Sequence, residues 1–291
     1  MDRMAAALIR YDLSLATYFS YPPAPAVRTR AMIPRQEPQA LYMRGEYGEK
    51  VDGGGMRPLT AHNTTHLDVP FHFDADGEDL AAVLNRADRV ADRPCLARVV
   101  CLAGDPALPG AHTRDGTTYC EAVSAAVLPP VAELRGYEAL VLLTGFGAVM
   151  AQYGERLYPR DPDGYYHVPW LTEDATAHVL AAGLRLVAID STTVERQTSS
   201  EPHRMSGDVH HALLRHDPPT LIVELIDGSA LAARVGFVPR EALLHVVPRR
   251  ANAAGADAAH SRAFLYFYRD DPAGEALRGL QGAITPQEFH G

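Results

Sequence analysis

Short apolar runs separated by turn-forming residues recur along the chain and predict strands that alternate with helices. The predicted strands cover residues 9–14, 64–73, 97–103, 139–145, 185–190, 220–226 and 242–247, and the aromatic run 264–268 predicts a final edge strand. The predicted helices cover residues 78–86, 129–135, 147–155, 172–182 and 208–215. Thr172 can cap the fourth helix and Gly183 can end it. This order is typical of an α/β protein with a mixed sheet.

Three segments do not fit the alternating pattern. Residues 22–60 are rich in proline and glycine, which predicts an extended arm over a site or a neighbouring subunit. Residues 156–170 form an aromatic-rich loop that could line a pocket for a flat substrate. Surface covering and oligomer contacts are the alternative for both segments. Residues 249–262 are alanine-rich and loop-like.

Length and charge limit the classes of protein. The 291 residues, 47% of them hydrophobic, can bury a sizeable core, and we interpret residues 1–291 as a single domain. The net charge of −9, with Lys50 as the sole lysine, argues against a nucleic-acid partner. No apolar run approaches the roughly 20 residues needed to cross a bilayer, so no membrane partner and a cytoplasmic location are expected. Three cysteines without paired spacing are expected to be reduced, and Cys101 to lie in the core.

The segment from His62 to His72 holds the densest chemistry in the chain. His62, His66, Asp68 and His72 all occupy even positions, so an extended chain would carry them on one face. Imidazole and carboxylate groups in such an arrangement are the ligands that zinc, manganese and iron accept. The alternative is a solvated polar turn.

Glu224 is the second candidate for a metal ligand. It interrupts the apolar run 221–226, where a buried carboxylate is costly unless a partner such as a metal ion neutralises it. The alternative is that Glu224 faces solvent on an edge strand. Taken on its residues alone, His210 would be an ordinary helix histidine.

The segment His62-Asn63-Thr64-Thr65-His66-Leu67-Asp68-Val69-Pro70-Phe71-His72-Phe73 resembles the signature H-x-G-T-H-x-D-x-P-x-H-F. That signature is typical of the cyclase and kynurenine formamidase superfamily of metal-dependent hydrolases, which includes arylformamidases and isatin hydrolase. Thr64 departs from the pattern, because the family has glycine there, so a methyl-bearing side chain must fit at this point of the backbone. The resemblance implies a cyclase-like swivelling β/β/α fold around a mixed, partly closed sheet.

Further segments are similar to the family in the same order along the chain. The resemblance covers residues 11–14, 141–146, 186–191, 208–214 and 221–225. It also implies a substrate-contacting segment at 18–23 that contains Phe19 and Tyr21, and we expect Phe71 to contact substrate as well.

The resemblance also implies roles for the site residues. The implied metal ligands are His62, His66, Asp68, His210 and Glu224, and His72 is implied as the general acid/base. His210 fits the family spacing better than its neighbour His211. The stretch between Leu214 and Glu224 is longer than the pattern, with the extra residues in the turn-forming segment 215–219.

Such a site would hold one or two divalent ions, zinc or manganese, that activate water against a substrate carbonyl. We therefore expect a metal-dependent hydrolase that opens an amide, lactam or lactone bond of a small, aromatic molecule. A metal-dependent cyclase in polyketide or other natural-product biosynthesis is the alternative, and a binding protein with structural metal is a third class. The protruding arm favours a homodimer or homotetramer.

Overall fold

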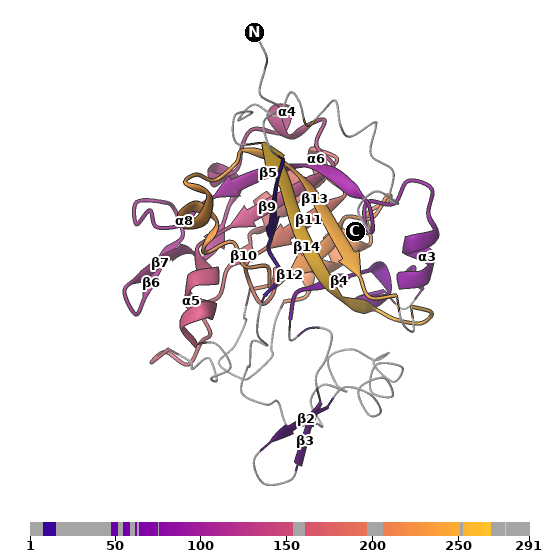
Figure 1. Ribbon diagram of the computed structural model, residues 1–291, viewed down its shortest axis with the longest axis horizontal. Helices are drawn as coiled ribbons and strands as arrows, with labels where there is room; N and C mark the ends of the chain where they lie inside the picture. Colours follow the sequence, from indigo (N-terminus) through magenta and orange to yellow (C-terminus); the bar gives the residue numbers. More distant parts are fainter. Residues whose placement is uncertain are drawn as a thin grey trace.

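The computed structural model describes residues 8–15, 48–51, 55–58, 62, 64–74, 76–153, 161–196, 206–250, 253–268 and 277. Most of the predicted arm at 22–60 lies outside the described residues. Phe19 and Tyr21, just before the arm, lie outside them as well. Within the arm, β2 (Gly48–Val51) and β3 (Gly55–Pro58) pair as an antiparallel hairpin. Figure 1 shows this hairpin apart from the main sheet.

The main sheet contains eight of the strands that the structure describes, in the order β1-β14-β13-β5-β9-β11-β12-β4. β5, β9, β11 and β12 run parallel to one another, and the remaining pairings are antiparallel. The strands are β1 (Leu8–Asp12), β4 (His66–Asp68), β5 (Pro94–Cys101), β9 (Ala139–Leu143), β11 (Leu186–Ile189), β12 (Leu221–Glu224), β13 (Glu241–Pro248) and β14 (Ala258–Tyr268). The predicted α/β class with a mixed sheet is confirmed.

β14 closes the sheet. Its first residues, Ala258 to His260, pair with β4, and its later residues pair with β13 and β1. Seven strands therefore form a closed ring, with β1 added beside β14 (Figure 1). The predicted strand at 264–268 is confirmed, but it is not at an edge, because it lies between β1 and β13. The prediction of a loop through residue 262 is wrong, because β14 begins at Ala258. Alanine is a weak strand former, so the start of this strand is set by pairing rather than by propensity.

The parallel strands form the centre of the hydrophobic core. Every residue of β9 and β11 is buried, as expected for strands covered on both faces. Full burial of one such leucine or valine side chain stabilises the fold by roughly 1.5–3 kcal/mol. The apolar runs at 139–145 and 185–190 thus predicted these strands because both of their faces avoid water.

Helices follow the strands closely, and most lie where the sequence predicts them. They are α3 (Leu80–Asn85), α4 (Val131–Leu134), α5 (Phe146–Tyr153), α6 (Glu173–Ala181), α7 (Asp208–Leu214) and α8 (Leu231–Val235), of which α8 was not predicted. The Thr172 side chain accepts a hydrogen bond from Ala175 N at the start of α6, as expected. None of the helices in the described ranges has both the length and the apolar composition that a membrane span requires.

Two small sheets and two 3₁₀ turns complete the described structure. β6 (Ala111–Arg114) and β7 (Thr117–Cys120) form a hairpin, and β8 (Ala122–Val123) pairs with β10 (Trp170–Leu171). The 3₁₀ turns are η2 (Pro70–His72) and η3 (Ala125–Val127). In the aromatic loop before β10, Tyr166 is buried in a small second core with Tyr119 and Phe146.

Asp190 ties the end of β11 to the start of α5. Its carboxylate accepts hydrogen bonds from the Thr144 amide and hydroxyl and from the amides of Gly145 and Gly147. Burial raises the pKa of Asp190 to about 7, and these four donors oppose the shift. This acidic residue therefore has a structural position at the end of the strand.

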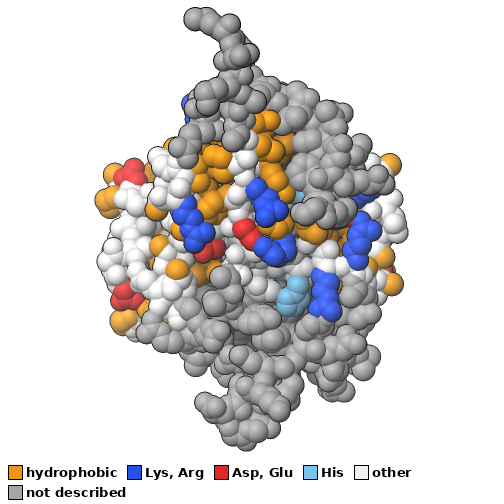
Figure 2. All heavy atoms as spheres, viewed as in Figure 1, with side chains coloured by type: hydrophobic (Ala, Val, Ile, Leu, Met, Phe, Trp, Pro, Cys, Tyr) orange, Lys and Arg blue, Asp and Glu red, His pale blue; other side chains and the backbone are white. Residues whose placement is uncertain are grey.

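The outer face of β1 and β14 carries arginine side chains among apolar ones (Figure 2). The Arg10 and Arg262 guanidinium groups lie 5.4 and 5.1 Å from the ring centroid of Phe264. Arg262 also forms an ion pair with Asp12 of the neighbouring strand. Cation–π and ionic contacts thus cover the partly buried ring of Phe264.

Candidate metal centre

β4 places two of the predicted ligands between the carboxylate of β12 and the start of β14. His66 stands directly opposite Glu224 of β12 on one side and opposite His260 of β14 on the other. Asp68, two residues later, points to the same face of the strand as His66. Register in the closed sheet, rather than spacing in the sequence, therefore brings Glu224 to the histidine segment.

Four buried side chains meet at this point. His66 Nε2 lies 3.5 Å from Asp68 Oδ2 and 3.3 Å from Glu224 Oε2. His210 Nε2, on α7, lies 3.8 Å from Asp68 Oδ2 and 3.4 Å from Glu224 Oε1. All four residues are at most 4% exposed. The separations are those of ligand atoms that surround a common ion rather than of hydrogen-bonded pairs.

The donor atoms at the centre fit a metal ion. His66 Nε2 and both carboxylate oxygens of Asp68 are buried and make no hydrogen bond. Buried polar atoms of this kind are costly unless a partner satisfies them. Nitrogen and carboxylate oxygen together are the donor set of zinc and manganese sites. A divalent cation bound here would supply the missing partner.

Asp68 belongs to two overlapping groups of ligands. One group joins it to His66 and Glu224, and the other joins it to His62 and His72; within each group the ligand atoms lie within 4.8 Å of one another. His62 Nδ1 is 3.4 Å from Asp68 Oδ1, the oxygen on the side away from His66. A carboxylate placed in this way can bridge two ions.

Three of the four central ligands are also contacted by a second group away from the centre. The Thr64 carbonyl lies 2.8 Å from His66 Nδ1, and Glu195 Oε1 lies 2.9 Å from His210 Nδ1. Val194 N donates to Glu224 Oε1 over 2.9 Å. Bonds at Nδ1 direct the Nε2 atoms of both histidines to the centre. Thr64 takes part in this contact through its backbone carbonyl.

His72 reaches the site by a turn and not on a continuous strand. The predicted strand 64–73 is wrong beyond Asp68, because β4 ends there and η2 follows. Pro70 lacks an amide for a strand ladder and suits the first turn of a helix. Gly77 lets the chain return, since a Cβ there would lie 2.7 Å from the Pro70 carbonyl carbon.

The turn stacks His72 on His62 and fixes it to an aspartate. The two imidazole rings are stacked with centroids 4.5 Å apart. His72 Nδ1 lies 3.0 Å from Asp257 Oδ2, and both side chains are 7% exposed. This bond leaves Nε2 as the ring nitrogen available for proton transfer or for a metal.

The adjacent residues His210 and His211 have different surroundings. His210 faces Asp68 and Glu224, whereas the His211 ring meets the edge of Phe73 with centroids 5.2 Å apart. Gly207, at φ 77°, begins α7 so close to Phe73 that an added Cβ would lie 3.3 Å from its ring. The predicted insertion at 215–219 falls in the turn between α7 and β12 and leaves His210 in place.

The predicted substrate contacts are only partly within the described structure. Phe71 is partly buried against the main core. The Phe73 ring stacks on His210 with centroids 4.3 Å apart and meets His72 edge-on at 4.7 Å. Phe73 therefore forms an apolar wall beside the histidines, whereas substrate binding by Phe71 stays a prediction.

The carboxylates also raise the pKa values of the central histidines. Burial alone would lower the pKa of His66, but the charges of Asp68 and Glu224 outweigh burial and raise it to about 10. The pKa of His210 is raised for the same reason, with Asp68, Glu195 and Glu224 as the opposing charges. A divalent cation competes for the same nitrogen lone pairs, because imidazole binds metal only when it is neutral.

Comparison with known proteins agrees with this geometry. The family model described as "Putative cyclase" matches residues 11–196, more than half of the chain. This chain belongs to the cyclase family. The curated kynurenine formamidase of Maricaulis maris (strain MCS10) is 27% identical over 207 residues, which cover 71% of this chain and 77% of the relative. The predicted family is thereby confirmed.

Solved structures share the fold of this cyclase-family protein. An isatin hydrolase bound to the product analogue thioisatinate superposes with a TM-score of 0.55 and 14% identity, covering 90% of this chain and 93% of its own. A potential metal-dependent hydrolase with cyclase activity gives a TM-score of 0.52 and 18% identity, covering 89% and 98%. The cyclase-like fold is confirmed, and the names of these relatives agree with the predicted enzyme class.

Sequence reasoning missed three residues of the site. Glu195 and Asp257 hold His210 and His72, and Phe73 packs against both histidines. Glu195 lies in a polar stretch between Asp190 and Arg196, so it lacks the apolar surroundings that marked Glu224. Asp257 stands in the alanine-rich segment interpreted as a loop, where nothing in the local pattern marks it.

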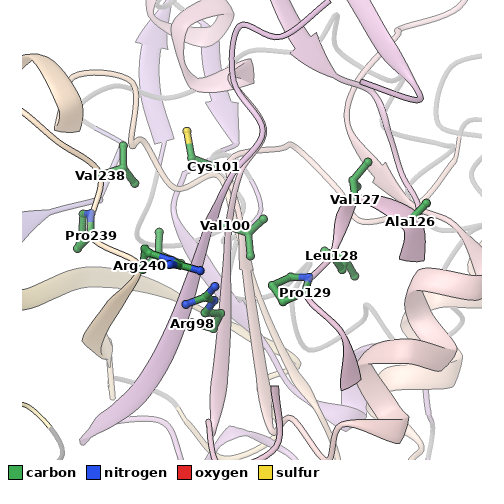
Figure 3. A pocket seen from close by; sticks show the side chains of 11 residues that line it. Arg98, Val100, Cys101, Ala126, Val127, Leu128, Pro129, Val238, Pro239 and Arg240 are labelled. Carbon is green, nitrogen blue, oxygen red and sulfur yellow. The ribbon is translucent and has the colours of Figure 1, made fainter. Parts of the chain in front are cut away.

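A separate hollow of about 330 Å³ in this cyclase-family protein shares no residue with the centre (Figure 3). β5, the stretch 126–129 and residues 238–240 line it, with Arg98 and Arg240 as its charged side chains. Cys101 at its rim is exposed, so the prediction of a core position is wrong, whereas Cys95 and Cys120 are buried. Cys101 is the last residue of β5, beyond the fully covered part of the strand.

Proposed function

We propose that this cyclase-family protein is a metal-dependent hydrolase that opens an amide, lactam or lactone bond of a small aromatic molecule. The observation that carries the proposal is the meeting of His66, Asp68, His210 and Glu224 around buried donor atoms without hydrogen bonds. The similarity to a kynurenine formamidase supports a carbon–nitrogen bond as the target.

The proposed cofactor is zinc or manganese, as one or two ions. His66, Asp68, His210 and Glu224 would hold the first, and Asp68 with His62 would contribute to a second. A bound ion of this kind lowers the pKa of water toward neutrality and polarises a carbonyl oxygen. The two groups that share Asp68 support the binuclear form.

His72 is proposed as the general acid/base. Asp257 accepts the hydrogen bond from its Nδ1 and thereby fixes the tautomer and the orientation of the ring. Nε2 can then take a proton from the attacking water and return it to the leaving nitrogen or oxygen. The stacked ring of His62 restricts rotation of His72.

Phe73 supports a planar, aromatic substrate. Its ring packs on His210 and reaches the edge of His72, so one side of the centre is apolar. Aromatic rings prefer such offset or edge contacts with other rings. A substrate with a flat ring beside its carbonyl matches this wall.

Cyclisation is the second candidate. The fold is shared with a potential metal-dependent hydrolase with cyclase activity. The same Lewis acid and imidazole could enolise a polyketide-like chain and close a ring, as in natural-product biosynthesis. The two reactions differ in whether water is consumed.

One experiment separates them. Protein purified without added metal is analysed for zinc and manganese and then assayed in ¹⁸O-water against formyl-anilides, isatin and lactones, with Asp68→Ala as the inactive control. Hydrolysis predicts one ¹⁸O atom per opened product. Turnover without the label, or equal turnover by Asp68→Ala, would contradict the proposed reaction.

We also propose a homodimer or homotetramer, on the basis of the arm expected at residues 22–60. Light scattering of the full chain tests this directly. A monomer over the micromolar range would contradict it.

A further inference from the structure

A second cluster of histidine and carboxylate side chains lies outside the candidate centre. It contains His112 of β6, Glu121 after β7 and His167 in the loop before β10, and one ligand atom from each lies within 4.8 Å of the others. His167 Nδ1 is 2.9 Å from Glu121 Oε1, and His112 Nδ1 is 3.4 Å from Glu121 Oε2. None of these residues belongs to the set around Asp68.

The backbone fixes all three residues. His112 stands opposite Tyr119 in the β6–β7 hairpin, and the Tyr119 hydroxyl donates to the His167 carbonyl. Trp170 N donates to the Glu121 carbonyl over 2.8 Å, directly beside the pairing of β8 with β10. One backbone hydrogen bond and one from the Tyr119 side chain therefore hold the loop against the hairpin.

The two imidazole rings are nearly parallel. Their centroids are 4.6 Å apart and their planes differ by 8°. This stacking presents Nδ1 of each ring to the carboxylate of Glu121. The two Nδ1 atoms and the Glu121 carboxylate thus lie within 4.8 Å of one another, and one ring has to turn out of the stack for both nitrogens to bind a single ion.

Asp163 sets the orientation of His167. Its Oδ2 lies 2.7 Å from His167 Nε2, on the opposite side of the ring from Glu121. A carboxylate that holds the far nitrogen of a histidine is a recurring outer partner in metal sites, where it fixes the tautomer and raises the basicity of the ligand. Asp163 can play this part for Nδ1 of His167.

The separations suit zinc. A tetrahedral ion with ligand bonds of about 2.0–2.1 Å keeps its ligand atoms roughly 3.3 Å apart. His167 Nδ1 lies 2.9 Å from Glu121 Oε1 and His112 Nδ1 lies 3.4 Å from Glu121 Oε2, so the distances to the two carboxylate oxygens lie on either side of this value. The three side chains are 23–27% exposed, so an ion can enter from solvent and keep a water molecule as its fourth ligand.

We propose that His112, Glu121 and His167 form a second, structural divalent-metal site for zinc, with Asp163 as its outer carboxylate. Bound metal would fasten the loop 161–169 to the β6–β7 hairpin. The competing arrangement is a protonated His167 held between two carboxylates. Burial would lower the pKa of His167, but hydrogen bonds to Asp163 and Glu121 outweigh it and raise the pKa.

The test counts zinc in the full-length protein. Wild type, His112→Ala, Glu121→Gln and the control His216→Ala, which replaces an exposed histidine in a turn, are saturated with Zn²⁺, freed of excess by gel filtration and analysed for metal. We expect His112→Ala and Glu121→Gln each to bind one equivalent less than wild type and His216→Ala. Equal zinc content in all four proteins would overturn the proposal.

Thermal unfolding gives a readout that does not depend on activity. A ligand that binds the native state alone stabilises it in proportion to the logarithm of its concentration over Kd. The rise in Tm on adding Zn²⁺ should therefore be smaller in His112→Ala and His112→Gln than in His216→Ala. If one His112 variant fails to fold, the other still tests the proposal. A rise in Tm as large as that of His216→Ala would contradict the site.

Discussion

Asp257 Oδ2 lies 3.0 Å from His72 Nδ1, although 185 residues separate the two in the sequence. A carboxylate that orients the ring of a general base contributes to turnover without touching substrate. Asp257→Asn should therefore lower kcat by about 10–100-fold while the bound metal stays unchanged. Steady-state kinetics and elemental analysis of the same preparation test this, with the exposed Asp88→Asn as the control. Equal losses of kcat in both variants would refute the positioning role.

Substitutions of His72 and of Asp68 should have different effects, the first on proton transfer and the second on metal binding. His72→Ala is expected to retain bound metal and to lose turnover by at least about 100-fold, the usual contribution of a general acid/base. Asp68→Ala removes a carboxylate shared by both ligand groups and should lose metal. Elemental analysis that gives the reverse pattern would exclude this division of roles.

Glu195 should tune metal affinity through His210. It accepts hydrogen bonds from both the amide and Nδ1 of His210, and these bonds aim Nε2 at the centre. Glu195→Gln removes the charge behind the ligand, so Kd for zinc should rise by about 10–100-fold. Competition with a chromophoric chelator measures this change, and the exposed Glu173→Gln provides the control. An unchanged Kd would assign Glu195 to packing alone.

Asp12 should make a small, pH-dependent contribution to stability. Partial burial would raise its pKa, but hydrogen bonds from Ser14 and Arg262 outweigh burial and lower it from 3.8. A lowered carboxyl pKa stabilises the fold above the unfolded value and loses this effect as the pH falls through the folded value. Because Asp12 is 39% exposed, Asp12→Asn should reduce the free energy of unfolding by less than about 1 kcal/mol at pH 7.

Urea titrations at several pH values test the sign of this effect. The difference between wild type and Asp12→Asn should shrink as the pH falls below 3.8. A difference that grows on acidification would contradict the lowered pKa.

The parts of the fold that local pattern determines were predicted from the sequence. The runs that became β9 and β11 are apolar at every position because both faces are covered, and Thr172 caps α6 where its side chain permits. The extent of β4 was not predicted, because Pro70 ends it by a local rule that the even spacing of the histidines concealed. The start of β14 was not predicted, because its pairing with β4 joins residues far apart in the sequence.

The candidate site shows the same division. His66, Asp68 and His72 were found from one short segment, and Glu224 from the cost of placing a carboxylate in an apolar run. Asp257 could not be found in this way, because its role depends on where β14 meets β4 and not on its neighbours in the chain. A residue such as Asp257, which orients a site residue by a hydrogen bond, can thus be identified only when the pairing of the strands is known.

The closure of the ring by β14 also sets an order on synthesis. β4 carries His66 and Asp68 near the beginning of the described chain, yet one of its two neighbours is the segment Ala258–His260. On the ribosome, the histidine segment emerges long before that neighbour is translated. We therefore expect these ligands to reach their final arrangement only after almost all of the described strands have left the exit tunnel, which would make metal binding at the Asp68 centre a late step in folding.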